Sequence, residues 1–256
     1  MAEVRLLETT GGIRNLQDAK KFCQDRARMC YSEKDPEEIK AEPYNNTLVD
    51  NILINNGHQS PFDHFNLTFY LGGFPKAFAM TMNNQRPYTT SEKSARYTQM
   101  DSVIPEQKEL YNKWMGIFMN RIKDVYSEKD FPKLYAQKGN QPALYEKLAQ
   151  ENARYMTSVF TPTRMDHTIS LAQLNVIAGN MEDFIKENSS DSQYFFKNRL
   201  GESMREFLDS QIVKDWRIPG LKDKTGRGLI LFGNKVEEHF GEDVYSTNSL
   251  MSFACL

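Results

Sequence analysis

The sequence has few cysteines, almost no net charge and no long apolar run, and each absence excludes a class of protein. Cys23, Cys30 and Cys255 form an odd set without CxxC spacing, which argues against a disulfide framework and for reduced thiols. A formal net charge of −2 provides no basic field for a nucleic-acid polymer. No apolar stretch is long enough to cross a membrane, and no signal-like segment opens the chain. We therefore expect a cytoplasmic protein whose basic residues bind small anions locally.

The chain is long enough to bury a substantial core, and its apolar pattern predicts an α/β fold with many helices. It predicts strands over 4–8 and over 65–71, where apolar and polar residues alternate. Helical spacing predicts helices over 15–31, 47–56, 74–83, 106–126, 142–157, 168–187 and 194–213, with a loop over 127–142. The length allows one domain or two closely joined ones. The composition changes beyond about residue 215.

The most informative segment covers residues 84–97, which combine arginines, a carboxylate and small hydroxyl side chains. Pro87 cannot donate a backbone hydrogen bond, so the chain turns there. We expect Ser91 to cap a helical turn that contains Glu92 and Arg96. Such a turn places Arg96 beside exposed backbone N–H groups, an arrangement that can bind a phosphate. The alternative is an ordinary Glu92–Arg96 ion pair on a solvated surface.

A second polar segment, residues 57–64, stands immediately before the strand predicted over 65–71. It contains His58 and His64 with Asp63 beside the second histidine, and both residue types are metal ligands. No cysteine pair or third histidine lies nearby in the sequence. We therefore expect no metal here.

Two of these segments resemble motifs of the flavin-dependent thymidylate synthases. Residues 57–64, GHQSPFDH, are similar to that family's GHxSPFEH segment, with Asp63 in place of the glutamate. Residues 84–97 resemble the family's signature RHRxxSxNExSxRY in part. The residues that match are Arg86, Glu92, Ser94, Arg96 and Tyr97, and those that depart from it are Asn84, Gln85, Thr89 and Ser91.

Further matches follow the same family order. Ala153 and Arg154, with Thr163 and Thr168, resemble the segment ARxxLPxxxxTxxxxTxNxR. The chain departs from it at Thr157, Ser158, Ser170 and Ala172. A weaker match covers residues 27–31, near the start of the chain. Matches in family order from residue 27 to about residue 181 indicate a divergent member of this family.

The resemblance implies a fold with a central, mostly antiparallel sheet flanked by long helices. It also implies a methyltransferase that converts dUMP to dTMP with FAD as cofactor, methylenetetrahydrofolate as carbon donor and NAD(P)H, here NADPH, as reductant. Family members form homotetramers with active sites between subunits. We accordingly expect one catalytic domain over residues 1–256, with a divergent C-terminal extension from about residue 215.

The resemblance implies binding residues in this chain, some at positions that match the family motifs and some, such as Asn84, Gln85 and Ser170, at positions where the residue type differs. For dUMP they are Thr81, Asn84, Glu92, Ser94, Ala95, Arg96 and Arg154. For FAD they are His58, Ser60, Asn84, Gln85, Arg86, Glu92 and Ser170. The resemblance assigns no catalytic residue, because reduced flavin supplies the electrons and no protein cysteine attacks the pyrimidine.

One departure concerns the chemistry itself. The family ionises the uracil ring with an arginine downstream of its Thr-x-Asn motif, and Met181 occupies that position here when the segments are aligned without gaps. A thioether can neither carry positive charge nor donate a hydrogen bond. The register shifts, or another arginine such as Arg164 or Arg199 enters the site, or the chemistry has changed. The alternatives to dUMP methylation are action on a different pyrimidine nucleotide, transfer of a hydroxymethyl group, and a non-catalytic nucleotide- or flavin-binding homologue.

Overall fold

The computed structural model describes residues 2–98, 104–137, 139–188, 195–221, 230–231 and 234–235. The chain divides into two compact units. Unit 1 comprises Met1–Phe74, Phe78–Ser91 and Arg164–Phe240, and unit 2 comprises Pro75–Ala77, Glu92–Thr163 and Gly241–Leu256. The single catalytic domain expected over residues 1–256 stays a prediction. Most of the expected C-terminal extension, with Cys255, lies outside the described residues.

A four-stranded sheet forms the centre of the fold, in the order β1-β2-β4-β3. Its strands are β1 (Glu3–Thr9), β2 (Asn66–Pro75), β3 (Thr89–Glu92) and β4 (Pro162–Ser170). β1 pairs antiparallel with β2. β4 also runs opposite to β2, because Leu171 N–H donates to the Phe65 carbonyl at 2.7 Å while the hydroxyls of Thr68 and Thr168 meet at 2.9 Å. The expected antiparallel sheet is confirmed.

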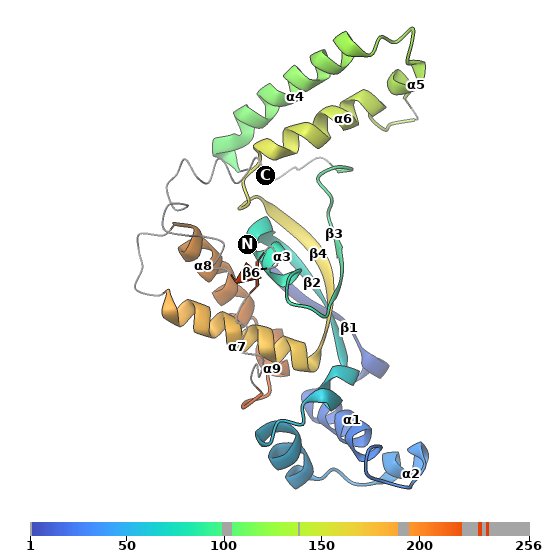
Figure 1. Ribbon diagram of the computed structural model, residues 1–256, viewed down its shortest axis with the longest axis vertical. Helices are drawn as coiled ribbons and strands as arrows, with labels where there is room; N and C mark the ends of the chain where they lie inside the picture. The colour runs from blue at the N-terminus through green and yellow to red at the C-terminus, as the bar shows by residue number, and fades with distance from the viewer. Residues whose placement is uncertain are drawn as a thin grey trace. The chain divides into compact units, whose positions relative to one another are not determined.

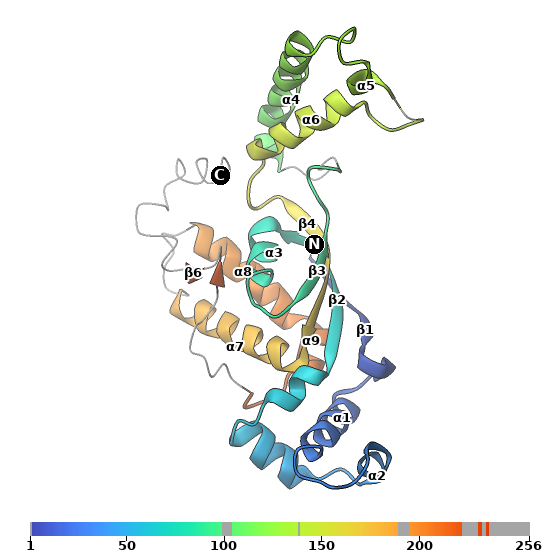
Figure 2. The same cartoon turned by 45° about the vertical axis from the view of Figure 1, so that its right-hand side comes forward.

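One face of the sheet is buried under helices of unit 1. Along β4, Met165, His167 and Ile169 are buried, whereas Arg164 and Asp166 are exposed, as alternation along a strand requires. Figures 1 and 2 show α7 (Leu171–Glu187) and α8 (Phe195–Asp209) on the same side of the sheet. Aromatic rings bridge the layers: Phe78 stacks on Phe74 at 4.5 Å and meets Phe207 in a tilted arrangement at 5.7 Å, centroid to centroid.

The N-terminal helices pack at one end of unit 1. They are α1 (Leu16–Arg28), α2 (Pro36–Ala41), the π-helix η2 (Thr47–Asn55) and the short 3-10 helix η3 (Ser60–His64). Phe65, which follows η3, is fully buried between Phe22 of α1 at 5.8 Å and Trp216 at 5.6 Å. Trp216 is the last residue of α9 (Gln211–Trp216), so this aromatic cluster joins α1 to a helix far along the chain.

Unit 2 is built around a pair of helices, which Figure 1 shows side by side. They are α4 (Pro105–Val125) and α6 (Leu144–Ala153), joined through α5 (Pro132–Tyr135), and α6 continues into the 3-10 helix η4 (Arg154–Met156). Tyr111 of α4 and Ala149 and Ala153 of α6 are buried. The first residues of α3 (Lys76–Met82) also belong to this unit. None of the described helices of the chain has the length and apolarity needed to span a membrane.

Several predicted boundaries are wrong for identifiable reasons. The helix predicted from residue 168 begins at Leu171, because residues 162–170 pair as β4 and Ser170 caps α7 by accepting the N–H of Gln173 at 3.0 Å. The helix predicted over 194–213 is interrupted at Ser210, whose hydroxyl caps α9. The loop predicted over 127–142 contains the short helix α5. Helices predicted over 15–31 and 106–126 are confirmed with small shifts as α1 and α4.

A buried amide ties α7 to the segment that follows α9. Asn175 is fully buried, donates from Nδ2 to the Leu171 carbonyl at 2.8 Å and accepts the N–H of Ile218 at 2.6 Å. We expect Asn175→Leu to lower the free energy of unfolding by about 2 kcal/mol, because it leaves the buried N–H of Ile218 without an acceptor. Urea denaturation followed by circular dichroism measures the change.

Asn152→Leu in α6 is the matched control. Asn152 makes the same bond, from Nδ2 to the carbonyl four residues earlier at 2.8 Å, but on an exposed surface. Its replacement should change stability by less than about 0.5 kcal/mol. Equal effects of the two substitutions would contradict the structural role given to Asn175.

His167 is a buried neutral side chain in the core of unit 1. Its ring stacks on Tyr88 at 5.3 Å, and neither ring nitrogen has a hydrogen-bond partner in the part of the chain that the structure describes. Burial lowers the pKa of His167 from 6.5 to about 4. The unfolded chain therefore takes up a proton on this histidine near pH 6.5, whereas the folded chain takes it up only near pH 4. The free energy of unfolding accordingly falls as the pH drops from about 6.5 to about 4.

We expect this one group to remove about 3 kcal/mol of stability between about pH 7 and about pH 4. Urea denaturation at a series of pH values, compared between wild type and His167→Phe, isolates its share from that of the carboxyl groups. The phenylalanine variant should lose stability less steeply below about pH 6.5. His64→Gln, which changes an exposed histidine, should keep the wild-type slope. Parallel curves for wild type and His167→Phe would refute the assignment.

Candidate nucleotide and flavin site

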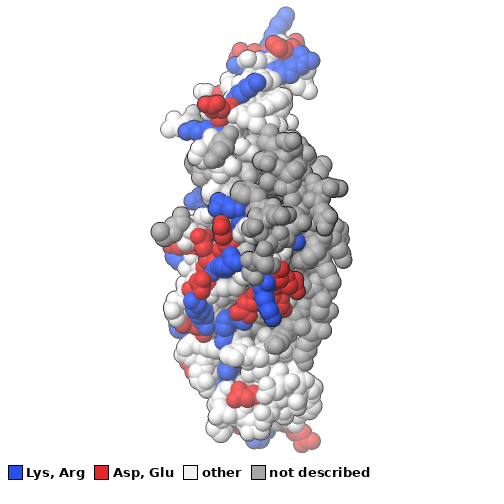
Figure 3. All heavy atoms as spheres, turned by 90° about the vertical axis from the view of Figure 1, so that its left-hand side faces the viewer, with Lys and Arg blue, Asp and Glu red and all other residues white. Residues whose placement is uncertain are grey.

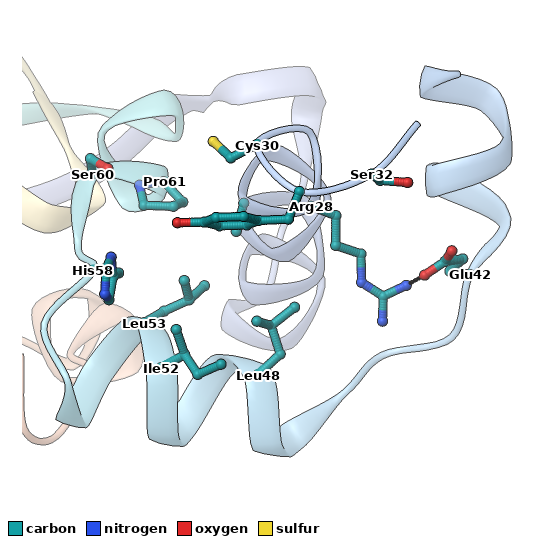
Figure 4. Close-up of a pocket in the computed structure, with 12 residues that line it drawn as sticks. Arg28, Cys30, Ser32, Glu42, Leu48, Ile52, Leu53, His58, Ser60 and Pro61 are labelled. Carbon is teal, nitrogen blue, oxygen red and sulfur yellow. Dashed lines mark ion pairs between the residues drawn. The ribbon is translucent and has the colours of Figure 1, made fainter. Parts of the chain in front are cut away.

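A pocket of about 280 Å³ lies in unit 1 between the end of α1, η2 and the start of η3 (Figure 4). His58 and Ser60 line it from the segment 57–64, and Arg28 and Cys30 line it from the segment 27–31. The fold therefore brings two of the family-like segments to one cavity. Gly57 makes this local path possible, because the chain turns there with a φ of +79°, between the end of η2 and the start of η3.

The walls of this pocket are mostly apolar. Figure 4 shows Leu48, Ile52 and Leu53 of η2 along one side, with His58 at the end of that row. Arg28 forms an ion pair with Glu42, so its charge is matched within the wall. Apolar walls with a few polar groups at the rim suit a planar ring system.

The other predicted flavin residues lie outside the lining of this pocket; Asn84, Gln85, Arg86 and Ser170 belong to unit 1, and Glu92 belongs to unit 2. Asn84 and Gln85 end the turn after α3, where Asn84 Nδ2 donates to the Met80 carbonyl at 2.6 Å. Gln173 of α7 holds this turn by donating to the Gln85 carbonyl at 2.8 Å. Arg86 follows and is exposed.

Asp63 and Ser170 join two family-like segments directly. The hydroxyl of Ser170 donates to Oδ1 of Asp63 at 2.7 Å, so the end of β4 is tied to the segment 57–64. Asp63 stands where the family has glutamate, and its shorter side chain is long enough to accept the hydrogen bond from Ser170. Sequence comparison shows both residues as departures and gives no sign that they contact each other.

The part of the family signature that follows β3 lies in unit 2 and forms a turn over residues 94–98, here called the signature turn. The carbonyl of Ser94 accepts the N–H groups of Tyr97 at 3.2 Å and Thr98 at 3.0 Å, and its hydroxyl accepts the N–H of Arg96 at 3.3 Å. The helical turn predicted to start at Ser91 is wrong, because Ser91 belongs to β3. The tight turn follows Glu92 instead.

Helix α6 holds this turn through one side chain. Gln150 Nε2 donates to the carbonyls of Ala95 at 3.1 Å and Arg96 at 3.4 Å. Arg154 follows Gln150 by four residues and so lies near the same face of the helix. Glu92, Ser94, Ala95, Arg96 and Arg154, all predicted to contact dUMP, therefore belong to one compact unit.

The two arginines of this group have no carboxylate partner among the described residues. The guanidinium of Arg96 lies 5.5 Å from the ring of Tyr97. Arg154 lies 4.9 Å from the ring of Tyr155, and it donates to the Glu151 carbonyl at 3.0 Å and to the Tyr155 hydroxyl at 3.1 Å. The alternative of a Glu92–Arg96 surface pair is not what forms. Guanidinium groups kept clear of carboxylates can serve an anionic ligand.

Glu92 instead contacts residues of other segments, among them Lys76 and Thr163. Lys76 Nζ lies 2.6 Å from Oε1 of Glu92, and the hydroxyl of Thr163 donates to the same oxygen at 3.1 Å. The Glu92 side chain is only 12% exposed. Motif comparison missed Lys76, because no family-like segment contains it and only the folded chain brings α3 to the end of β3.

Thr81 and Met181 are both fully buried in unit 1. Thr81 lies in α3, where its carbonyl accepts Nε2 of Gln85 at 2.7 Å. Met181, which an ungapped alignment sets at the position of the family's arginine, packs on the buried face of α7. Of the two substitutes considered, Arg164 is exposed on β4, and Arg199 pairs with Glu202 at 3.0 Å on α8.

Charged side chains of both signs share the described surface. Figure 3 shows Lys, Arg, Asp and Glu side chains intermixed over the described part of one face, with no broad field of either sign. Within the described ranges, no group of three or more His, Cys, Asp or Glu side chains is placed to hold a metal ion.

Comparisons with known proteins agree with these motifs. The sequence pattern of the family described as Thymidylate synthase complementing protein matches residues 6–179. A flavin-dependent thymidylate synthase of Clostridium tetani (strain Massachusetts / E88) is 26% identical over 218 residues, which cover 80% of this chain and 81% of that protein.

Two solved structures resemble the chain at low identity. The UMP/dUMP methylase PolB from Streptomyces cacaoi, bound with 5-Br dUMP, has 15% identity and a TM-score of 0.45 over 70% of this chain and 77% of that one. Thymidylate Synthase X (ThyX) from Helicobacter pylori, with FAD and dUMP, has 13% identity and a TM-score of 0.42 over 84% of this chain and 100% of that one. The family pattern covers well over half of this chain, and the protein therefore belongs to the flavin-dependent thymidylate synthase family.

Proposed function

We propose that this protein converts dUMP to dTMP, with FAD as cofactor, methylenetetrahydrofolate as carbon donor and NAD(P)H as reductant. The observation that carries the proposal is the arrangement in unit 2, where Gln150 holds the signature turn against the helix that leads to Arg154. Arg96 and Arg154 have no carboxylate partner among the described residues. Two such cations suit the phosphate of a nucleotide, because guanidinium forks match phosphate oxygens.

In this proposal the nucleotide residues of unit 2 are Glu92, Ser94, Ala95, Arg96 and Arg154. Thr81 and Asn84, the two other residues that the family resemblance gives to dUMP, belong to unit 1. The side chain of Thr81 is fully buried. Its backbone carbonyl supports the turn after α3 by accepting the hydrogen bond from Gln85. Ser94 leaves room for close approach of the ligand to the backbone, since its side chain is small.

The residues of unit 1 fit a flavin in chemical type. The pocket beside His58 and Ser60 has apolar walls and a volume near the lower limit of ligand pockets, about 300 Å³, so it fits a ring system rather than a whole dinucleotide. FAD supplies the reducing electrons of the reaction when it is bound. In the proposal His58 and Ser60 face its ring, and Asn84, Gln85, Arg86, Glu92 and Ser170 contribute further contacts.

The protein's own part is alignment and charge placement rather than nucleophilic attack. Cys23 is fully buried, and burial raises the pKa of its thiol to about 12, so it is not a thiolate at neutral pH. Holding nucleotide, folate and cofactor in register converts a reaction between separate molecules into one within a complex. A homotetramer with active sites between subunits and a cytoplasmic location remain part of the proposal.

One observation favours a second candidate function. In an ungapped alignment Met181 stands where the family has its ring-ionising arginine, and its side chain is uncharged and fully buried in α7. A family relative that acts on a different pyrimidine nucleotide, or transfers a hydroxymethyl group, accommodates this change.

The absorption spectrum of the purified protein tests the cofactor, and product analysis tests the reaction. We expect flavin bands in the visible spectrum, which bleach under NADPH. With methylenetetrahydrofolate, the reduced protein should convert dUMP to dTMP, and UMP and dCMP should remain unmodified. Methyl transfer confined to UMP or dCMP would reject dUMP as substrate, and tight dUMP binding without turnover would reveal a binding protein.

Replacement of Arg96 tests the nucleotide site. We expect Arg96→Ala to weaken dUMP binding by about 1.5–3 kcal/mol in calorimetric titration, because it removes charged hydrogen bonds to the phosphate. Arg121→Ala, an exposed arginine of α4 in the same unit, is the matched control and should leave dUMP affinity unchanged. If the two variants bind dUMP equally well, Arg96 is a plain surface residue.

A further inference from the structure

Lys76 contacts the signature segment although it lies outside every family-like motif. It is the first residue of α3, and its backbone N–H donates to the Thr161 carbonyl at 3.0 Å. Its Nζ lies 2.6 Å from Oε1 of Glu92. Among the described residues, Glu92 is the only side chain that this ammonium contacts, and the lysine side chain remains 42% exposed. An ammonium has three N–H donors, so two of them remain after the bond to Glu92.

The pair joins segments that are distant in sequence and shields a carboxylate. Glu92 is 12% exposed, whereas the acids of the pairs Arg199–Glu202 and Lys214–Asp209 are 56% and 75% exposed. Exposed pairs of that kind contribute little to stability, because solvent screens them. The Lys76–Glu92 pair instead places a cation against an anion that the signature supplies.

A carboxylate in a nucleotide site has an electrostatic cost. The phosphate of a nucleoside monophosphate is itself an anion, so an unmatched Glu92 would repel the ligand that Arg96 and Arg154 attract. A cation held against that carboxylate cancels most of the repulsion. Thr163 donates a neutral hydrogen bond at 3.1 Å, which orients the carboxylate but leaves its charge unchanged.

We propose that Lys76 is a positioning residue of the nucleotide site, which acts through Glu92 by fixing its carboxylate and cancelling its charge toward the phosphate of the ligand. This inference rests on the proposed function, because Glu92 is assigned to the nucleotide only through it. The role requires a positive charge at residue 76 for as long as residue 92 is an anion. It also makes the ligand's phosphate, and not its base, the group that responds to the loss of Lys76.

A double-mutant cycle with two ligands tests this role. Calorimetric titration of the flavin-loaded protein with dUMP and with deoxyuridine, which lacks the phosphate, compares wild type, Lys76→Met, Glu92→Gln and the double variant. We expect Lys76→Met to raise the Kd for dUMP about tenfold and that for deoxyuridine less than about twofold. In the Glu92→Gln background the same substitution should change the dUMP Kd less than about twofold, because no carboxylate is left to neutralise.

Three further proteins separate this role from a purely structural one. Lys76→Arg keeps the charge and should bind dUMP within about threefold of wild type. Lys214→Met breaks the exposed pair with Asp209 in unit 1 and should leave both affinities unchanged. Lys76→Gln replaces Lys76→Met in the cycle if the methionine variant does not yield folded protein, as judged by circular dichroism and the flavin spectrum.

The outcomes distinguish this inference from the proposed function. If wild type binds dUMP and Lys76→Met binds it equally well, or loses both ligands to the same extent, the inference is overturned and the proposed function stands. The inference also fails if the loss persists in the Glu92→Gln background. A wild-type protein that does not bind dUMP overturns both.

Discussion

The carboxylate of Glu92 is the point on which the arrangement of unit 2 depends. It ends β3, and it accepts hydrogen bonds from Lys76 at the start of α3 and from Thr163 in β4. A carboxylate that is only 12% exposed needs such partners, because leaving it unpaired would cost several kcal/mol. The start of the signature turn is therefore held in place at Glu92, and Gln150 holds the turn itself by donating to the Ala95 carbonyl. The positions of Arg96 and Arg154 follow from these two attachments.

In unit 1 a second carboxylate, that of Asp63, also holds two segments together by a hydrogen bond. Asp63 accepts the hydroxyl of Ser170, and the same hydroxyl oxygen accepts the N–H of Gln173 in the first turn of α7. Serine and asparagine are both strong N-capping residues, so the change from the family's asparagine to Ser170 preserves the start of the helix. The two departures at these positions thus leave the junction between β4, α7 and the segment 57–64 intact.

The sequence predicted features whose signal is local and missed features that depend on pairing. Periodicity was sufficient for the strand over 65–71 and for α4, because each buries one regular set of side chains. It failed for β4, since Thr168 and Ile169 also fit a helical pattern and only pairing with β2 decides between the two. Ser91 is a good capping residue, but the neighbouring Thr90 donates to the Asp166 carbonyl at 3.1 Å, which fixes an extended strand. The family motifs pointed to Glu92, Arg96 and Arg154, which the structure places in one compact unit, yet they contained no sign of Lys76.

Met181, which an ungapped alignment sets at the position of the family's arginine, is fully buried, and a methionine suits such a place. A thioether with no exposed surface packs in the core of α7 without the desolvation cost that a guanidinium would incur there. In the proposed site the positive charge for a nucleotide then comes from Arg96 and Arg154 of unit 2, while Lys76 offsets the charge of Glu92. Because the whole chain carries a net charge of −2, attraction of an anion rests on these local groups and not on a long-range field. A carboxylate among them reduces that attraction unless it is neutralised, and this is why the pairing of Glu92 matters more here than it would in a strongly basic protein.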